Sequence, residues 1–214
     1  MNMQQLFKQA ATNRAALEGN PYPGRGIGIG LNKSGKHLIL VTFVTGRSGG
    51  SRNRRYKLLD HGRVDTEVAD LSKETGDPEK TIYSAMAGHS GVYLASNGRQ
   101  TDTVFECWGV TENDFERAMN KHTYENDSIS TPRITAVCVT PGNNAYTGKM
   151  SILRRSPFGT TCERNFFNFE EFCPGIGHFL TTYLTDGNPP PIYQGEPFFL
   201  PLVGDNPTDI AEEL

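Results

Sequence analysis

The amino-acid sequence predicts a single α+β domain in which antiparallel strand pairs form the sheets and helices pack outside them. Short apolar runs of strand length outnumber helical patterns, and the helical patterns fall mainly near the start and the middle of the chain. The chain has 214 residues, of which 36% are hydrophobic, so it can bury a sizeable core. We see neither an internal repeat nor a low-complexity linker. We therefore expect residues 1–214 to be one domain, with a helical extension over 1–20 and a proline-rich segment over 186–214.

The first part of the chain reads as a helix followed by a hairpin. Met3–Glu18 has apolar residues at helical spacing, and Gly19-Asn20-Pro21 is a stop signal. Arg25–Leu31 alternates glycine with isoleucine, which is typical of a strand packed closely against another backbone. Asn32–Gly35 is a turn, and the apolar run His37–Val44 is the next strand, so the two strands should pair.

The central part mixes strands with one helix. Tyr56–Val68 is predicted to be a strand pair or an extended connection, and Gly91–Ala95 a strand that ends in the turn Ser96-Asn97-Gly98. Arg99–Thr103 is interpreted as a turn in which threonine and aspartate side chains cap the backbone. Thr111–Lys121 begins with Thr-x-x-Asp and has apolar residues at helical spacing, which indicates a helix.

The last part is mostly extended. Three further strands are predicted: Arg133–Thr140, Met150–Arg154 and Ile176–Leu184. His178 is isolated in the last of these strands and is interpreted as a core residue. Phe158–Cys173 is aromatic, and we assign no element to it. The prolines of 186–214 exclude long regular elements there.

The charge and the cysteines exclude several classes of protein. A net charge of −3 with a sequence pI near 6.0 argues against a global nucleic-acid-binding surface. The four cysteines contain no Cys-x-x-Cys pair, so we expect neither a zinc site nor a disulfide framework. The sequence has no signal-like apolar start and no run of about 18 apolar residues. We therefore expect a soluble, cytoplasmic protein.

The most conspicuous polar stretch is Gly46–Arg55, which directly follows an apolar strand. Glycines let a backbone approach a ligand closely, and arginines bind phosphate or carboxylate oxygens in pairs. Such a loop suits a small anionic molecule at the end of a strand. A solvated surface loop, or a patch for non-specific polyanions, is the alternative interpretation.

Familiar catalytic motifs are missing from the sequence. It has no Gly-x-x-x-x-Gly-Lys-Ser/Thr, no His-Glu-x-x-His and no Gly-x-Ser-x-Gly, which disfavours nucleoside-triphosphate, zinc and serine-hydrolase chemistry. Polar clusters instead stand near predicted strand ends: Arg47–Arg55, Asn97–Thr103, Tyr124–Asp127 and Thr131–Arg133. If they converge, they form a pocket suited to a phosphorylated small molecule and to proton transfer without a metal or cofactor.

Several short motifs in these clusters match one known family. They are Gly46-Arg47-Ser48, Ser51-Arg52-Asn53-Arg54, Ile82-Tyr83-Ser84-Ala85-Met86, Ser96-Asn97-Gly98-x-Gln100-Thr101-Asp102-Thr103, Tyr124-Glu125-x-Asp127, Thr131-Pro132-Arg133-Ile134, Asp186-Gly187-Asn188-Pro189 and Gly195-Glu196-Pro197. In this order they resemble the archaeal-type IMP cyclohydrolases, from about Tyr22 to Pro197. The proline-rich end is more similar to bacterial members of that family.

The resemblance implies a four-layer αββα sandwich like that of the N-terminal-nucleophile hydrolases, without self-processing. It also implies the last step of purine biosynthesis, in which 5-formamidoimidazole-4-carboxamide ribotide closes to IMP and releases water. The partners would be this small molecule and IMP, with no nucleic acid, membrane or cofactor, and we expect a homo-oligomer.

The resemblance also assigns residues by position. Arg52 and Tyr83 would hold and polarise the formyl or carboxamide oxygen, and Glu125 would transfer a proton. The ribose phosphate and the ring amide would be bound by Arg47, Ser48, Asn53, Arg54, Asn97, Thr101, Asp102, Thr103, Asp127 and Arg133. Arg133 is as consistent with a structural ion pair as with an anion clamp.

Three other interpretations remain open at this point. The same pocket could bind a purine nucleotide without turnover. A hydrolase with the N-terminal-nucleophile fold would need a processed Cys, Ser or Thr, which a helix starting at Met3 disfavours. An RNA-binding module would use the basic loop and would show a steep dependence on salt.

Overall fold

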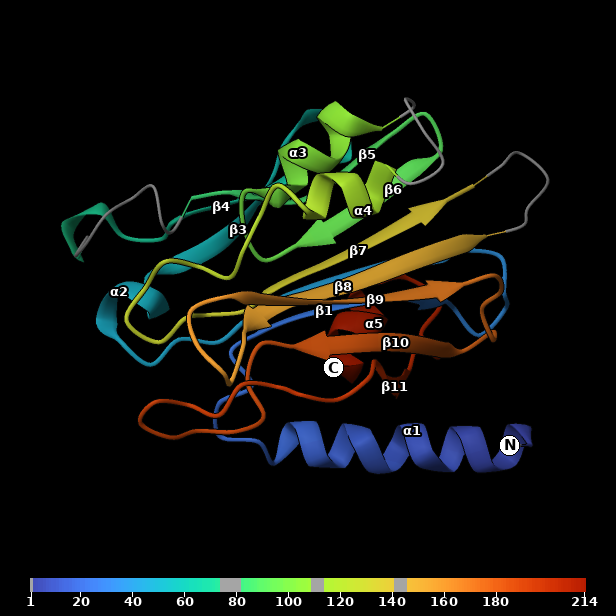
Figure 1. Cartoon of the computed structure of the whole chain (residues 1–214). Coiled ribbons are helices and arrows are strands. Elements are labelled where there is room, and N and C mark those ends of the chain that lie inside the picture. Colours follow the sequence, from blue (N-terminus) through green and yellow to red (C-terminus); the bar gives the residue numbers. More distant parts are fainter. Residues whose placement is uncertain (1, 74–81, 109–113, 141–145) are drawn as a thin grey trace.

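The computed structural model describes residues 2–73, 82–108, 114–140 and 146–214, and it is built around two antiparallel β-sheets (Figure 1). The smaller sheet has the strand order β11-β10-β1-β2. Its strands are β1 (Arg25–Leu31), β2 (Leu38–Val44), β10 (Ile176–Thr181) and β11 (Phe198–Pro201). The predicted α+β class with antiparallel strand pairs is confirmed.

The larger sheet follows the order of the chain, so each strand pairs antiparallel with the next one in sequence. Its strands are β3 (Arg54–Leu58), β4 (Val64–Val68), β5 (Ser84–His89), β6 (Val92–Ser96), β7 (Arg133–Val139), β8 (Thr147–Arg155) and β9 (Cys162–Phe169). Because neighbours alternate in direction, the starts of β3, β5 and β7 lie at the same end of the sheet as the end of β6. Polar residues at those termini are thereby brought together.

The two sheets face each other across the main core. Alternate residues of β1, such as Ile27 and Ile29, pack in one cluster with Ile134 of β7 and Ile152 of β8. The glycines between them face the opposite side of the small sheet, where the rings of Phe43 and Phe179 occupy the places that the Cβ atoms of Gly26 and Gly28 would fill. The glycine–isoleucine run is therefore closely packed, but Gly26 and Gly28 pack against aromatic rings and not, as predicted, against another backbone.

Helices cover the outer faces of both sheets (Figure 1). α3 (Gln100–Cys107) and α4 (Asp114–Met119) contribute Val104 and Phe115 to a second core against β6, β7 and β8. α1 (Met3–Glu18) and α5 (Pro207–Glu213) contribute Leu17 and Ile210 to a third core against β10 and β11. The remaining helical segments are α2 (Gly49–Arg52), η1 (Asp60–Gly62) and η2 (Leu71–Lys73).

Most predicted elements are confirmed. Helix Met3–Glu18 has the predicted bounds, with a capping box between Asn2 and Gln5. The hairpin of β1 and β2 and the strand pair within Tyr56–Val68 are also present. The helix predicted over Thr111–Lys121 is α4, although residues 111–113 lie outside the described part of the chain.

Two predictions of local structure are wrong, and one unassigned segment contains a strand. The turn at Arg99–Thr103 is not formed, because helix α3 begins at Gln100 and is held by the burial of Val104 and Cys107. Phe158–Cys173, to which no element was assigned, contains strand β9. The strand predicted over Ile176–Leu184 ends at Thr181.

All four cysteines are free. The ring contacts of His178 agree with its interpretation as a core residue. His178 lies between the rings of Phe169 and Phe199, at centroid distances of 4.1 and 5.1 Å, and burial lowers its pKa to about 4. None of the described helices is long and apolar enough to cross a membrane.

Candidate functional site

A cluster of ionisable side chains lies at the end of the sandwich where β3, β5 and β7 start. We call it the polar cluster and define it as Arg25, Arg54, Tyr83, Glu125 and Arg133. Arg25 and Arg133 open β1 and β7, Arg54 opens β3, and Tyr83 directly precedes β5. Glu125 comes from the irregular segment between α4 and β7. The antiparallel order of the strands is what assembles residues up to 108 positions apart.

The centre of the polar cluster is a bidentate ion pair between the two sheets. Arg25 donates from Nη1 to Glu125 Oε1 at 2.7 Å and from Nη2 to Oε2 at 2.8 Å. The two side chains are only 13% and 19% exposed. Burial by itself lowers the pKa of Arg25, but the charge and hydrogen bonds of Glu125 outweigh burial and raise it. The paired geometry fixes both carboxylate oxygens.

The buried Asn97 supports this pair from the end of β6. Its backbone carbonyl accepts a hydrogen bond from Arg25 Nη1 at 2.5 Å. Its side chain donates to the Pro132 carbonyl at 2.8 Å and accepts from the Ile134 amide at 2.9 Å. Asn97 therefore joins the end of β6 to the start of β7 and presents its carbonyl to Arg25.

Arg133 lies on the other side of Glu125 and is held by Gln100. Arg133 Nη1 donates to Gln100 Oε1 at 2.9 Å and lies 3.9 Å from Glu125 Oε1. Gly98 makes this approach possible: an added Cβ would lie 2.8 Å from Gln100 Oε1 and 3.5 Å from Glu125 Oε1. Any larger residue at position 98 would displace Arg133 or Gln100.

The polar cluster contains more positive than negative charge. It has three guanidinium groups and one carboxylate, and that carboxylate is already paired with Arg25. Arg54 donates from Nε to the Ser51 carbonyl at 3.1 Å, and burial together with the charge of Arg25 lowers its pKa. The pKa of Arg133 is lowered too, by burial first and then by Arg25 and Arg99. A bound anion would relieve this repulsion, so the cluster favours an anionic ligand.

Tyr83 adds a phenol to the same place. The residue is 7% exposed, and its ring lies close enough to Arg25 and Arg54 to interact electrostatically with both. Its backbone is fixed to β4, because its amide donates to Thr66 Oγ1 at 3.0 Å and its carbonyl accepts from the Thr66 amide at 2.9 Å. A buried phenol between two guanidinium groups can donate a hydrogen bond to a ligand oxygen.

The structure thus brings five of the sequence-predicted site residues to one place: Arg54, Tyr83, Asn97, Glu125 and Arg133. Of these, Asn97 contributes its backbone rather than a free amide. Asp127 is close by but closes a turn, since its carboxylate accepts from the Thr131 amide at 2.9 Å and from Thr131 Oγ1 at 2.5 Å.

The residues of the arginine-rich stretch mostly stabilise their own loop. Ser48 caps α2 by accepting from the Ser51 amide, and the Asn53 side chain bonds to the backbone of Asp70. Arg52 is exposed and donates from Nε to the Gly46 carbonyl at 2.9 Å. α2 nevertheless lies at the same end of the molecule as the segment that carries Glu125 (Figure 1).

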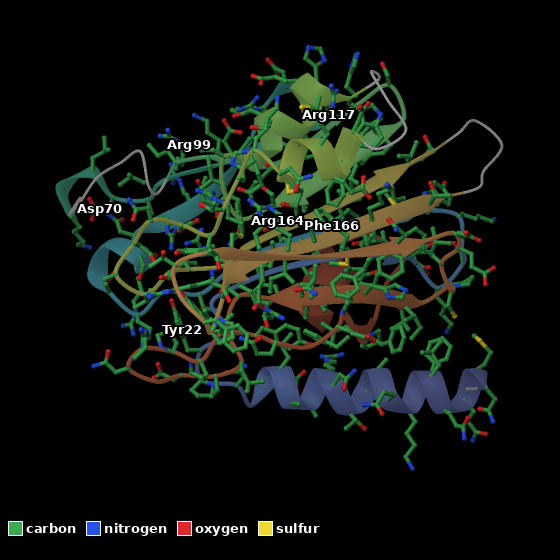
Figure 2. All side chains as sticks on the ribbon, in the orientation of Figure 1. Tyr22, Asp70, Arg99, Arg117, Arg164 and Phe166 are labelled. Carbon is green, nitrogen blue, oxygen red and sulfur yellow. The ribbon has the colours of Figure 1, made fainter. Side chains whose placement is uncertain are left out.

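Arg47 is held by contacts with residues near both ends of the chain, Tyr22 and Asp186-Gly187. Its Nη1 donates to Asp186 Oδ1 at 2.8 Å and to the Gly187 carbonyl, and its guanidinium lies 4.6 Å from the ring centroid of Tyr22. Tyr22, labelled in Figure 2, stacks in turn on Tyr183 at 5.4 Å. These contacts account for Arg47 without a ligand.

Three predicted residues on α3 bond to groups outside the polar cluster. The Thr101 hydroxyl is fully buried and donates to the Ser84 carbonyl. Asp102 is half exposed and lies 3.5 Å from Arg63 Nη2, and Thr103 Oγ1 bonds to His122 Nε2 at 2.9 Å. These contacts support α3 and its neighbours.

Sequence reasoning did not single out Arg25 as a site residue. The signal available was a charged residue at the head of a strand that is otherwise glycine and apolar. Gln100, which holds Arg133, was noted only within a motif. Its complete burial together with three hydrogen bonds identifies it as a support for the site.

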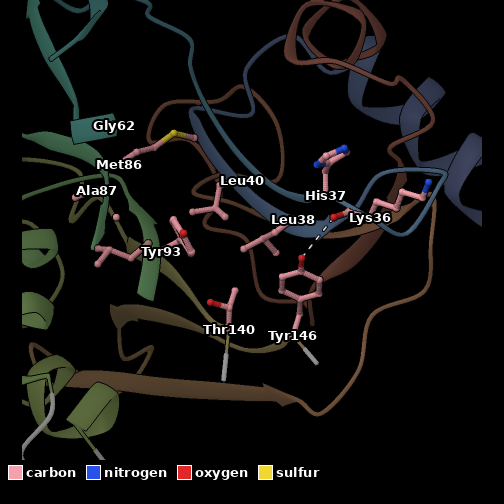
Figure 3. A pocket seen from close by; sticks show the side chains of 12 residues that line it. Lys36, His37, Leu38, Leu40, Gly62, Met86, Ala87, Tyr93, Thr140 and Tyr146 are labelled. Atoms are coloured by element: carbon pink, nitrogen blue, oxygen red, sulfur yellow. Dashed lines mark hydrogen bonds between the residues drawn. The ribbon is translucent and has the colours of Figure 1, made fainter. Parts of the chain in front are cut away.

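A separate cleft of about 430 Å³ lies at the opposite end of β2 (Figure 3). It is lined mainly by apolar side chains of both sheets, among them Leu38, Leu40, Met86 and Tyr93. Leu38 pairs with Leu31 at one end of the hairpin, whereas Arg25 pairs with Val44 at the other. The cleft therefore does not include the polar cluster, and chemistry favours the cluster as the site.

No group of three or more His, Cys, Asp or Glu side chains that could hold a metal ion occurs within the described residues. The fold and the polar cluster together define a two-sheet α+β protein whose strand ends bring three guanidinium groups, one carboxylate and one phenol to one place.

Comparison with models of known protein families shows to which family the chain belongs. The family model described as IMP cyclohydrolase-like protein matches residues 22–214, so the chain belongs to the IMP cyclohydrolase-like family. The match begins just after α1 and includes the whole proline-rich end of the chain. The motifs identified in the sequence extend only as far as Pro197. A search of curated proteins finds no match to this chain.

Proposed function

We propose that this protein is an IMP cyclohydrolase, which closes 5-formamidoimidazole-4-carboxamide ribotide to IMP and releases water. The observation that carries the proposal is the polar cluster, where one oriented carboxylate lies among three arginines in a member of the IMP cyclohydrolase-like family. The substrate is an anionic ribotide whose two reacting groups are neighbours on one ring. The protein therefore needs to bind, orient and move protons rather than supply a nucleophile.

The reaction has two chemical stages. The carboxamide nitrogen attacks the formyl carbon, so a C–N bond forms and the formyl oxygen takes up a proton as the nitrogen loses one. The C–O bond of the resulting hydroxyl then breaks as the former formamido nitrogen loses its proton, so a C=N bond forms and the hydroxyl leaves as water with that proton. A base that accepts the proton and donors that hold the formyl oxygen lower both barriers.

The residues of the polar cluster suit these tasks. We assign proton transfer to Glu125, whose two oxygens are held by Arg25. Tyr83 is the donor for the formyl or carboxamide oxygen. Losing such a donor costs roughly 3 kcal/mol of transition-state stabilisation.

We assign binding of the ribose phosphate to the two arginines of the polar cluster that do not form the bidentate pair with Glu125. Arg54 and Arg133 are half-buried cations whose pKa values burial and neighbouring charge lower, and a phosphate would compensate both. Arg52, exposed on α2, is assigned to the capture of substrate at the rim of the site. Asn53, Asp127 and Asn97 are assigned to holding the loops in place, on the basis of their backbone contacts.

Two broader features belong to the same proposal. The order of layers, with helices outside two facing sheets, supports the αββα sandwich of the N-terminal-nucleophile hydrolases, here without self-processing. We also propose that the reaction needs no metal or other cofactor and takes place in the cytoplasm. A homo-oligomeric state remains a prediction, which light scattering of the purified protein would check.

The test is an ultraviolet assay of the purified protein with the formamido ribotide, with and without a chelator. We expect IMP to form at the same rate in both. If the protein binds IMP but forms none from the ribotide, the alternative of a purine-nucleotide-binding protein without turnover replaces this proposal. A rate that a chelator abolishes and added metal restores would contradict metal-independent catalysis.

A further inference from the structure

The segment that carries Glu125 is closed on itself by hydrogen bonds. The Glu125 amide donates to the Thr131 carbonyl at 2.8 Å. Within this loop the Asp127 carboxylate accepts from the Ile129 and Thr131 amides. The position of Thr131 therefore determines the position of the Glu125 backbone.

Thr131 is in turn attached to the other sheet by one side chain. The Tyr183 hydroxyl lies 2.7 Å from Thr131 Oγ1, which lies 2.5 Å from Asp127 Oδ2. A carboxylate only accepts, so the threonine hydroxyl donates its single proton to Asp127 and accepts from Tyr183. Burial raises the pKa of Tyr183 to about 12, which keeps the phenol protonated and able to donate.

Tyr183 is itself fixed to the strand that carries Arg25. Its amide donates to the Pro23 carbonyl at 3.1 Å, and the amide of the preceding Thr182 donates to the Arg25 carbonyl at 2.9 Å. Only 2% of Tyr183 is exposed, and its ring stacks on Tyr22. The hydroxyl thus links the loop of Glu125 to the backbone of its partner Arg25.

We propose that Tyr183 is a positioning residue that sets Glu125 against Arg25 through its hydrogen bond to Thr131. This inference rests on the proposed function, because it gives Tyr183 a part in the same reaction. Tyr183 does not contact the reacting atoms. It acts on the rate by keeping the carboxylate where the proton must be transferred.

The test compares Tyr183→Phe with Tyr193→Phe. Both variants remove one phenol oxygen and keep the ring, but the Tyr193 hydroxyl donates to the Glu196 carbonyl instead of to Thr131. In Tyr183→Phe we expect kcat to fall about tenfold while KM stays within about twofold. The variant loses the orientation of the Glu125 carboxylate but keeps the groups that bind the ribotide. Tyr193→Phe should match the wild type in both constants.

A second readout needs no turnover. Hydrogen exchange followed by mass spectrometry should show the amides of residues 125–131 exchanging about fivefold faster in Tyr183→Phe, and unchanged in Tyr193→Phe. Thr131→Val should reproduce the effect, and adding Tyr183→Phe to it should change kcat by less than about twofold, since both remove the same link.

The outcomes separate this inference from the proposed function. A wild-type protein that never forms IMP overturns the proposed function and, with it, any part of Tyr183 in that reaction. In an active wild type, unchanged exchange over residues 125–131 in Tyr183→Phe overturns the inference alone. Faster exchange with an unchanged kcat does the same, because the loop would then be held without consequence for the reaction.

Discussion

The two ends of the sandwich differ in what they bury. At one end, the polar cluster packs three guanidinium groups around one carboxylate in a nearly enclosed setting. At the other end, the cleft of Figure 3 encloses about 430 Å³ and is lined by Leu38, Leu40, Met86 and other apolar side chains. Burying charge without full compensation is costly, and strongly perturbed ionisable groups are often found at functional sites. Charge, rather than the presence of a cleft, is therefore the reason to propose the polar cluster as the ribotide site.

The largest effect should come from the carboxylate. Glu125→Gln keeps the shape of the side chain but removes the proton acceptor, so kcat should fall by about a thousandfold. Circular dichroism should show a folded protein. The matched control is Glu163→Gln on β9, which removes the partner of Arg154 outside the polar cluster and should leave kcat unchanged. Equal turnover of Glu125→Gln and the wild type would remove Glu125 from the mechanism.

The second effect concerns stability. Arg25→Met leaves the buried Glu125 without its partner and should lower the free energy of unfolding by at least about 3 kcal/mol. Urea unfolding monitored by tryptophan fluorescence measures it. Adding Glu125→Leu to Arg25→Met should recover part of the loss, because an uncompensated charge is then no longer buried. A loss below about 1 kcal/mol in Arg25→Met would show that the pair is solvated and weak.

His178 lies at neither end and predicts a pH effect. Burial lowers its pKa to about 4 in the folded protein, against about 6.5 when unfolded. Between these values the unfolded chain binds more protons, so stability falls as the pH drops from about 6.5 towards 4. The contribution is at most about 3 kcal/mol. In urea unfolding at several pH values, His178→Leu should show a smaller loss on acidification than the wild type. The exposed His37→Gln should behave as the wild type.

The smallest effect is expected in the cleft. Tyr93 is 41% exposed there, so Tyr93→Leu should change the free energy of unfolding by less than about 0.5 kcal/mol and leave kcat and KM unchanged. Steady-state kinetics and urea unfolding check both. A large rise in KM for the ribotide would move substrate binding from the polar cluster to the cleft and reverse the comparison.

The fold was predictable from the sequence where periodicity was clear. The first helix and the hairpin follow from their spacing and turns. Helix α3 was missed because its first residues, Gln100 to Thr103, are polar and resemble a capped turn. The apolar contacts that stabilise it, through Val104, are with strands of the larger sheet and not with its neighbours in sequence. β9 was missed because consecutive phenylalanines, Phe166 and Phe167, pack on opposite faces and hide the alternation.

The site was predictable only in part. Short motifs near strand ends indicated Arg54, Tyr83, Glu125 and Arg133, and the structure places these side chains together, although their roles remain predictions. The charge of Arg25 at the start of an apolar strand was a signal, but it did not indicate a partner, because Glu125 lies 100 positions away and only the strand order brings the two together. Arg47 is the opposite case. A motif in the sequence indicated it as a site residue, and in the structure its guanidinium forms an ion pair with Asp186.

The central claim is that the polar cluster binds the phosphate of a purine ribotide, and calorimetric titration of IMP and inosine tests it most directly. In the wild type, IMP should bind at least roughly tenfold tighter than inosine, because the phosphate compensates Arg54 and Arg133. In Arg54→Gln that preference should largely disappear, while Tyr93→Leu keeps it. Equal affinity of the wild type for IMP and inosine, or an unchanged preference in Arg54→Gln, would contradict the account.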